Sequence, residues 1–194
     1  MAKTKPGKDS MDDEKLKWDA LDERELLKTR VFRVLSRRER AGDIEGDYIA
    51  LDAPDCVVVI PEYRGNFVLV RQWRHGAGRL TTEFPGGVVD RGEDPREAAL
   101  RELREETGYR AGSMELLGVC SPNPALFNSR FYCFLARELE PAGKLEPDPD
   151  ELLNVFLRPI DEAIADFGGE DETHAFMGAA LAFYLRAKMY PELT

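Results

Sequence analysis

The sequence lacks any long apolar run. No stretch approaches the ~20 apolar residues that a membrane-spanning helix requires, and the N-terminus has no apolar segment of the signal-peptide kind. Residues 1–13 are polar, and we expect them to form a disordered tail. These features predict a cytoplasmic protein with no membrane partner.

Basic residues are also scarce. The 194 residues include 27 Lys and Arg against 37 Asp and Glu, which gives a formal net charge of −10 at pH 7. Because proteins that bind nucleic acid depend on a basic surface, we expect no nucleic-acid partner. We interpret the two histidines, His75 and His174, as hydrogen-bonding residues rather than metal ligands.

The chain has three cysteines, Cys56, Cys120 and Cys133, which lie far apart in apolar segments. Their odd number argues against a framework of disulfides, and their spacing is not that of a zinc site. We therefore expect buried free thiols in a reducing compartment.

A helix with clear start and stop signals is predicted over residues 95–107. Asp94 supplies a side-chain acceptor at the N-cap, and Pro95 occupies the first helical position, where a missing N–H costs nothing. Gly108 can adopt the positive φ that ends a helix.

Three glutamates, Glu102, Glu105 and Glu106, occupy one sector of this helix. Like charges at this spacing repel each other, and one interpretation is a solvated acidic face. The glycine-rich run Pro85–Gly87 precedes the helix, however, and can bring a backbone carbonyl close to the carboxylates. Carboxylate and carbonyl oxygens suit Mg²⁺ or Mn²⁺, so the pattern favours a metal site that also binds phosphate.

The spacing of this stretch carries a family resemblance. Gly87 is followed after five residues by Glu93. Seven further residues lead to Arg101–Tyr109, whose sequence is RELREETGY, with Leu103 at the apolar position U of the motif below. Every fixed position of the Nudix motif G-x5-E-x7-REUxEExGU is occupied, with Tyr109 a loose fit to the last. The chain therefore resembles a Nudix hydrolase, which implies an α/β fold: an α/β/α sandwich with a mixed sheet.

The rest of the chain fits this organisation. We expect the tail over 1–13, a small N-terminal antiparallel β-unit over 14–53 and the Nudix hydrolase domain over 54–194. Strands are predicted over residues 29–37, 44–51, 56–61, 67–71, 114–120, 130–136 and 152–158, and residues 80–84 lead into the motif. Helices are predicted over residues 95–107, 159–167 and 172–190. The β-unit has little apolar mass of its own, so it must pack on its own domain or on a second subunit.

Three features outside the motif resemble the branch of ADP-ribose pyrophosphatases and nucleoside-diphosphate-sugar hydrolases. They are the N-terminal β-unit, the run Val70–His75 leading to Glu83, and Pro124, which lies fifteen positions after Tyr109. This branch implies a homodimer formed through the β-unit. It also implies Mg²⁺-dependent hydrolysis of a nucleotide sugar to a nucleoside monophosphate and a sugar phosphate.

The resemblance also implies residue roles. Glu102, Glu106 and the Gly86 carbonyl would bind metal with Glu105 close by, and Glu93 and Arg101 would brace the helix and the loop. The candidates for substrate binding are Arg71, Arg74, Arg130, Glu83 and Trp18. The candidates for the general base are Glu151 and, second, Glu146. For the arginines, pairing with surface carboxylates is an open alternative.

Other substrates stay open within the family: NADH, a dinucleoside polyphosphate or a nucleoside triphosphate. A Nudix module that binds a nucleotide sugar without cleaving it is a further alternative. Such modules usually lose glutamates of the motif, and none is missing between Glu93 and Glu106.

Overall fold

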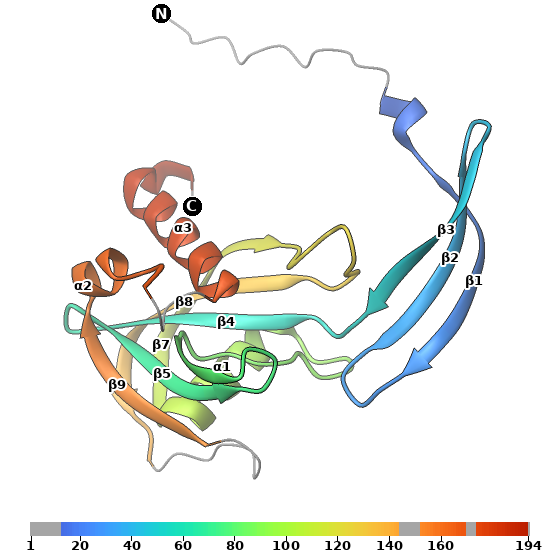
Figure 1. Cartoon of the computed structure of the whole chain (residues 1–194). Helices are drawn as coiled ribbons and strands as arrows, with labels where there is room; N and C mark the ends of the chain where they lie inside the picture. Colours follow the sequence, from blue (N-terminus) through green and yellow to red (C-terminus); the bar gives the residue numbers. More distant parts are fainter. Residues whose placement is uncertain (1–12, 144–151, 170–173, 194) are drawn as a thin grey trace, which may run out of the picture. The chain divides into compact units, whose positions relative to one another are not determined.

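The computed structural model describes residues 13–143, 152–169 and 174–193, which form two compact units (Figure 1). One unit combines Met1–Ala53 with Ala125–Asn128, and the other combines Pro54–Pro124 with Ser129–Thr194. The short segment 125–128, which lies between two strands of the second unit, thus belongs with the N-terminal sheet.

The N-terminal unit is a three-stranded antiparallel sheet in the order β1-β2-β3, preceded by the 3-10 turn η1. Its elements are η1 (Asp13–Leu16), β1 (Asp19–Lys28), β2 (Arg33–Ala41) and β3 (Ile44–Asp52). The predicted strand over 29–37 began too early, because Thr29 starts a turn: its Oγ1 accepts the N–H groups of Val31 and Phe32, at 3.1 and 2.9 Å. The strand β1 was missed, since its charged sequence shows no buried face.

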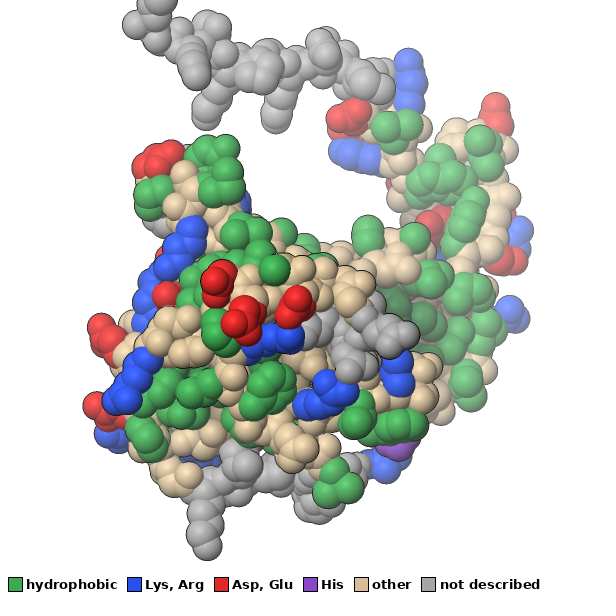
Figure 2. Space-filling model, turned by 60° about the vertical axis from the view of Figure 1, so that its left-hand side comes forward, with side chains coloured by type: hydrophobic (Ala, Val, Ile, Leu, Met, Phe, Trp, Pro, Cys, Tyr) green, Lys and Arg blue, Asp and Glu red, His purple; other side chains and the backbone are tan. Residues whose placement is uncertain are grey.

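Segment 125–128 is fixed to the end of β3. The N–H of Leu51 donates to the Leu126 carbonyl at 2.7 Å, and the Asn128 Nδ2 donates to Asp52 Oδ1 at 2.6 Å. Hydrophobic side chains are visible on the surface of the described residues (Figure 2). In the N-terminal unit, Leu26 and Tyr48 are both exposed.

The second unit has a six-stranded sheet in the order β6-β5-β4-β8-β7, with β9 paired to β5. Strands β4 and β8 are parallel and the other pairs are antiparallel, so the sheet is mixed, as predicted. Its strands are β4 (Cys56–Tyr63), β5 (Asn66–Arg74), β6 (Arg79–Glu83), β7 (Tyr109–Cys120), β8 (Phe131–Pro141) and β9 (Leu153–Pro159). Its helices are α1 (Pro95–Thr107), α2 (Ile160–Ala165), α3 (Ala175–Met189) and the 3-10 turn η2 (Pro191–Leu193).

The side chains of β4 divide the core into two layers, because successive residues of a strand face opposite sides of a sheet. Val57 and Val59 pack with the apolar side of α1, whereas Val58 and Ile60 pack with residues of α2 and α3. Helices therefore cover both faces of the sheet (Figure 1), which confirms the predicted α/β/α sandwich.

Helix α1 has the predicted bounds and the predicted caps. The Asp94 side chain accepts the N–H of Arg96 at 2.8 Å, and Gly108 has a φ of 70° and donates its N–H to the Arg104 carbonyl. Within the part of the chain that the structure describes, no helix is both long enough and apolar enough to cross a bilayer.

Candidate active site

The run Pro85–Gly87 lies along β4 like a short extra strand. The N–H of Val59 donates to the Pro85 carbonyl at 2.8 Å, and the N–H of Val57 donates to the Gly87 carbonyl at 2.9 Å. Because carbonyls alternate in direction along an extended segment, the Gly86 carbonyl between them is directed away from β4.

Two glycines let this loop come close to its neighbours. A Cβ on Gly86 would lie 2.2 Å from the Val57 carbonyl oxygen, a distance that real contacts do not reach. A Cβ on Gly87 would lie 2.4 Å from Glu102 Oε1. The close approach of the loop to β4 therefore depends on the absence of a side chain at Gly86, whereas a Cβ at Gly87 would displace the Glu102 carboxylate.

Glu106 fixes the loop from the side of α1. Its Oε2 accepts the N–H of Gly86 at 2.9 Å, and only 1% of the residue is exposed. A buried carboxylate is costly unless it is hydrogen-bonded or paired with positive charge. The contact places the Glu106 carboxylate beside the Gly86 peptide, as expected if the two share a ligand.

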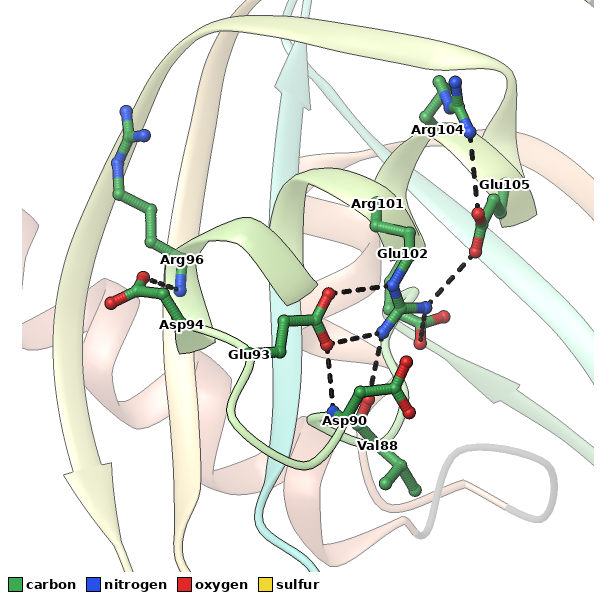
Figure 3. A network of polar contacts seen from close by, with 9 residues as sticks. All are labelled: Val88, Asp90, Glu93, Asp94, Arg96, Arg101, Glu102, Arg104 and Glu105. Atoms are coloured by element: carbon green, nitrogen blue, oxygen red, sulfur yellow. Dashed lines mark hydrogen bonds and ion pairs between the residues drawn. The ribbon is translucent and has the colours of Figure 1, made fainter.

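The Arg101 guanidinium lies among the carboxylates of the motif (Figure 3). Its Nε and Nη2 donate to the two oxygens of Glu93, each at 3.0 Å, and Nη2 also donates to the Val88 carbonyl at 3.1 Å. Its Nη1 donates to Glu102 Oε1 at 2.7 Å and to Glu105 Oε2 at 3.3 Å. Arg101 thus ties the loop before α1 to the helix and balances part of the repulsion between the glutamates.

The same network shifts the pKa values of Glu93 and Arg101. The hydrogen bond from Arg101 lowers the pKa of the Glu93 carboxyl, and Glu93 in turn raises the pKa of Arg101. Glu93 also accepts the N–H of Asp90 at 2.9 Å. The pair therefore stays charged at neutral pH and holds the loop in place.

The donor set fits a divalent cation that keeps some of its water. Glu102, Glu106 and the Gly86 carbonyl offer hard oxygen ligands, and Mg²⁺ typically takes only one or two carboxylates alongside water and phosphate. Among the described residues, no three His, Cys, Asp or Glu side chains form a preassembled metal site.

A second polar group surrounds Glu83, whose side chain is 4% exposed. Arg74 donates to both of its oxygens, at 2.8 and 2.6 Å, and the Thr81 hydroxyl donates to one of them. Burial raises the pKa of the Glu83 carboxyl, but these bonds outweigh it and the net pKa is lowered. His174 Nε2 lies 3.8 Å from Glu83 Oε2, and burial lowers the pKa of the imidazole.

Both groups line one cavity of about 670 Å³ in the second unit. Its lining residues come from β4 to β6, the glycine loop, α1 and the start of α3: Cys56, Val57, Val58, Arg74, Glu83, Phe84, Gly86, Gly87, Val88, Asp90, Arg101, Glu102, Glu105, His174, Phe176 and Met177. The structure therefore brings together six of the residues that the sequence singled out: Gly86, Glu102, Glu105, Arg101, Arg74 and Glu83.

Two of the proposed substrate contacts lie elsewhere. Among the described residues that line the cavity, neither Arg71 nor Arg130 occurs. The Arg71 side chain donates to the Thr82 hydroxyl at 3.5 Å, and the backbone N–H of Arg130 donates to Asp55 Oδ1 at 2.7 Å.

The remaining candidates fall outside this unit's described part. Trp18 belongs to the N-terminal unit, where its ring meets the edge of Tyr48 at a centroid distance of 5.2 Å. The two candidates for the general base, Glu146 and Glu151, lie outside the described residues.

Sequence reasoning missed the contribution of α3 to the cavity. His174, Phe176 and Met177 all line it, but their local sequence carries no motif, and their position depends on how α3 packs on the sheet. Cys56 also lines the cavity. Burial raises its pKa to about 11, so it is a protonated thiol at neutral pH.

Comparison with known proteins supports the resemblance seen in the motif. The sequence matches the NUDIX domain family over residues 52–177. It is 36% identical over 115 residues to the methanol dehydrogenase activator of Bacillus methanolicus, and this alignment covers 57% of this chain and 61% of that protein. It is 30% identical over 158 residues to the ADP-sugar pyrophosphatase of Mus musculus, and this alignment covers 74% of this chain and 68% of that protein.

A solved structure shares the fold over almost the whole chain. The crystal structure of an ADP compounds hydrolase aligns with a TM-score of 0.79 and 25% identity, covering 91% of this chain and 96% of that one. The alignments with three curated relatives cover 61%, 55% and 54% of their lengths, so the chain spans a little more than half of each.

Proposed function

Because the chain belongs to the Nudix family, as its match over residues 52–177 shows, we propose that it hydrolyses the pyrophosphate bond of a nucleoside diphosphate sugar. ADP-ribose is the first candidate. The names of two similar proteins, an ADP-sugar pyrophosphatase and an ADP compounds hydrolase, support this substrate class.

The observation that carries the proposal is the contact between α1 and the glycine loop. Glu106 bonds to the N–H of Gly86 at 2.9 Å, and the Glu102 carboxylate lies against Gly87. Gly86 and Glu102 line a cavity that is also lined by the cationic side chains Arg74 and Arg101. The buried Glu106 is not a lining residue of this cavity, but its carboxylate holds the Gly86 peptide in place. This combination suits a substrate that carries a diphosphate.

In the proposed reaction, a bound Mg²⁺ or Mn²⁺ would neutralise the diphosphate and promote ionisation of water. Glu102, Glu106 and the Gly86 carbonyl would hold the ion, with Glu105 close by. The water oxygen bonds to one phosphorus while the bridging oxygen leaves with the other phosphate, and the proton of water passes to a base. The products are a nucleoside monophosphate and a sugar phosphate.

The base remains a prediction, with Glu151 first and Glu146 second. Of the two arginines that line the cavity, Arg74 would contact the diphosphate. We keep Trp18, Arg71 and Arg130 as weaker candidates for substrate contacts. A cytoplasmic location is likewise still a prediction.

A turnover screen with Mg²⁺ and Mn²⁺ tests the function. We expect release of a nucleoside monophosphate from ADP-ribose, ADP-glucose, GDP-mannose or UDP-glucose, detected by chromatography. Turnover of NADH, a diadenosine polyphosphate or a nucleoside triphosphate alone would keep the chemistry and change the substrate class. Ligand binding without any turnover would identify a binding module instead.

Replacing Glu106→Gln tests the metal assignment. The amide oxygen can still accept the Gly86 N–H, so we expect a native fold, but the lost charge should lower turnover by roughly 100-fold. Glu97→Gln is the matched control, since Glu97 lies on the same helix, is exposed to solvent and forms an ion pair with its neighbour Arg96. Full Mg²⁺-dependent activity of the Glu106 variant would refute the assignment.

We also propose that the protein forms a homodimer through the N-terminal sheet. Every residue of β1 is exposed, and Leu21, Leu26 and Leu27 among them are large apolar side chains that a second subunit would cover. Light scattering should show that Leu26→Lys weakens association. Leu157→Lys is the control, because Leu157 is equally exposed in the other unit, 47% against 48%. Equal masses for both variants and the unaltered chain would count against this interface.

A further inference from the structure

The start of α3 forms a wall of the same cavity that the motif glutamates line. His174 precedes the helix, and Phe176 and Met177 belong to its first turn; all three line the cavity together with Glu102 and Glu105. The reaction proposed above gives these α3 residues no role. Their chemistry therefore indicates what else the cavity accepts.

Phe176 offers a fixed aromatic surface. Its ring is stacked on Phe131, with a centroid distance of 4.8 Å and an angle of 6° between the planes. Phe131 is fully buried at the start of β8, so it supports the Phe176 ring from the core side. An aromatic ring that is held in this way can pack against the apolar face of a ligand at little entropic cost.

His174 offers polar groups next to this ring. The imidazole meets the edge of the Phe176 ring at 5.2 Å, and its Nε2 lies 3.8 Å from Glu83 Oε2. Burial lowers the pKa of His174, so the imidazole is neutral at neutral pH. A neutral imidazole has one N–H donor and one acceptor nitrogen, the pair of functions that a hydroxyl group also has.

The Arg74–Glu83 pair completes this part of the cavity. Arg74 donates hydrogen bonds of 2.8 and 2.6 Å to the two oxygens of the Glu83 carboxylate. The neutral imidazole of His174 lies beside this charged pair. An aromatic face next to neutral and charged hydrogen-bonding groups matches a sugar ring, which has C–H faces and hydroxyl edges.

We propose that His174 and Phe176 form the subsite for the sugar ring of the sugar phosphate half of the substrate. Phe176 packs against the C–H face of the ring, and His174 hydrogen-bonds a ring hydroxyl. Both are specificity-determining residues, and the assignment rests on the proposed function, because it presupposes that the diphosphate lies at Glu102 and Glu106.

Calorimetry with the full chain in Mg²⁺ tests the subsite by binding rather than turnover. The two probes are ribose 5-phosphate, for the sugar half, and AMP, for the nucleoside half. For His174→Gln and Phe176→Leu we expect the Kd of ribose 5-phosphate to rise about tenfold, which is about 1.4 kcal/mol, and the Kd of AMP to stay within about twofold.

Matched controls use the same substitutions away from the cavity. Phe183→Leu changes another phenylalanine of α3, and His75→Gln changes the other histidine of the chain, which is exposed. Both controls should bind the two probes like the unaltered protein. Because Phe176 packs on Phe131, its variant could be destabilised, and the partly exposed His174 then supplies the decisive result.

The outcomes separate the two proposals. Weaker binding of ribose 5-phosphate alone supports the subsite. Weaker binding of AMP alone, unchanged binding of both probes, or no binding of ribose 5-phosphate to the unaltered protein overturns it. The proposed function is judged separately by turnover of the nucleotide sugars in the screen. A protein that binds ribose 5-phosphate through His174 but cleaves none of them would refute the proposed function, and the site would then be a sugar phosphate-binding site rather than part of a substrate subsite.

Discussion

At the scale of single residues, the absence of a Cβ at Gly86 decides how closely the glycine loop approaches β4. An added methyl group would lie 2.2 Å from the Val57 carbonyl oxygen, so either the loop or the strand would have to move. Because this neighbour is backbone rather than a flexible side chain, the contact cannot be relieved by a change of rotamer.

We therefore expect Gly86→Ala to lower the free energy of unfolding by about 1–3 kcal/mol, measured by urea denaturation. Gly76→Ala is the matched control, since a Cβ at Gly76 would have nothing within 4 Å. Equal midpoints for the two variants would mean that the loop adapts without cost.

At the scale of elements, α1 depends on its caps to place the glutamates. The Asp94 side chain accepts the Arg96 N–H at 2.8 Å, satisfying one of the N–H groups that a helix start leaves unpaired. Asp94→Ala should lower the free energy of unfolding by about 1 kcal/mol, and Asp94→Asn, which keeps an acceptor, should restore most of it. Thermal unfolding followed by circular dichroism would show this; an asparagine variant as unstable as the alanine variant would contradict the cap.

The elements also show what the sequence could predict and why. The bounds of α1 were predicted to the residue because Asp94, Pro95 and Gly108 act locally. Strand β1 was not predicted, because its ten residues form a strand only by pairing with β2 and show no buried face. The place of His174 in the cavity could not be predicted either, since it depends on how a helix distant in sequence packs on the sheet.

At the scale of the whole molecule, the two units should differ in how their stability arises. In the described part of the N-terminal unit, Leu35 is the buried hydrophobic residue and Ser36 the buried polar one, whereas the second unit holds both core clusters. A three-stranded sheet with so little buried apolar area is marginal by itself. If a second copy covers it, its stability must rise with protein concentration by mass action.

The chain offers a direct probe of this difference, because it has two tryptophans, Trp18 in the N-terminal unit and Trp73 on β5 of the other. The variant Trp73→Phe leaves fluorescence to Trp18, and Trp18→Phe leaves it to Trp73. We expect the urea midpoint reported by Trp18 to rise as protein concentration is increased a hundredfold, while the midpoint reported by Trp73 rises less. A Trp18 midpoint that stays constant with concentration would show that the sheet is stable without a partner, and the exposed leucines of β1 would then need another explanation.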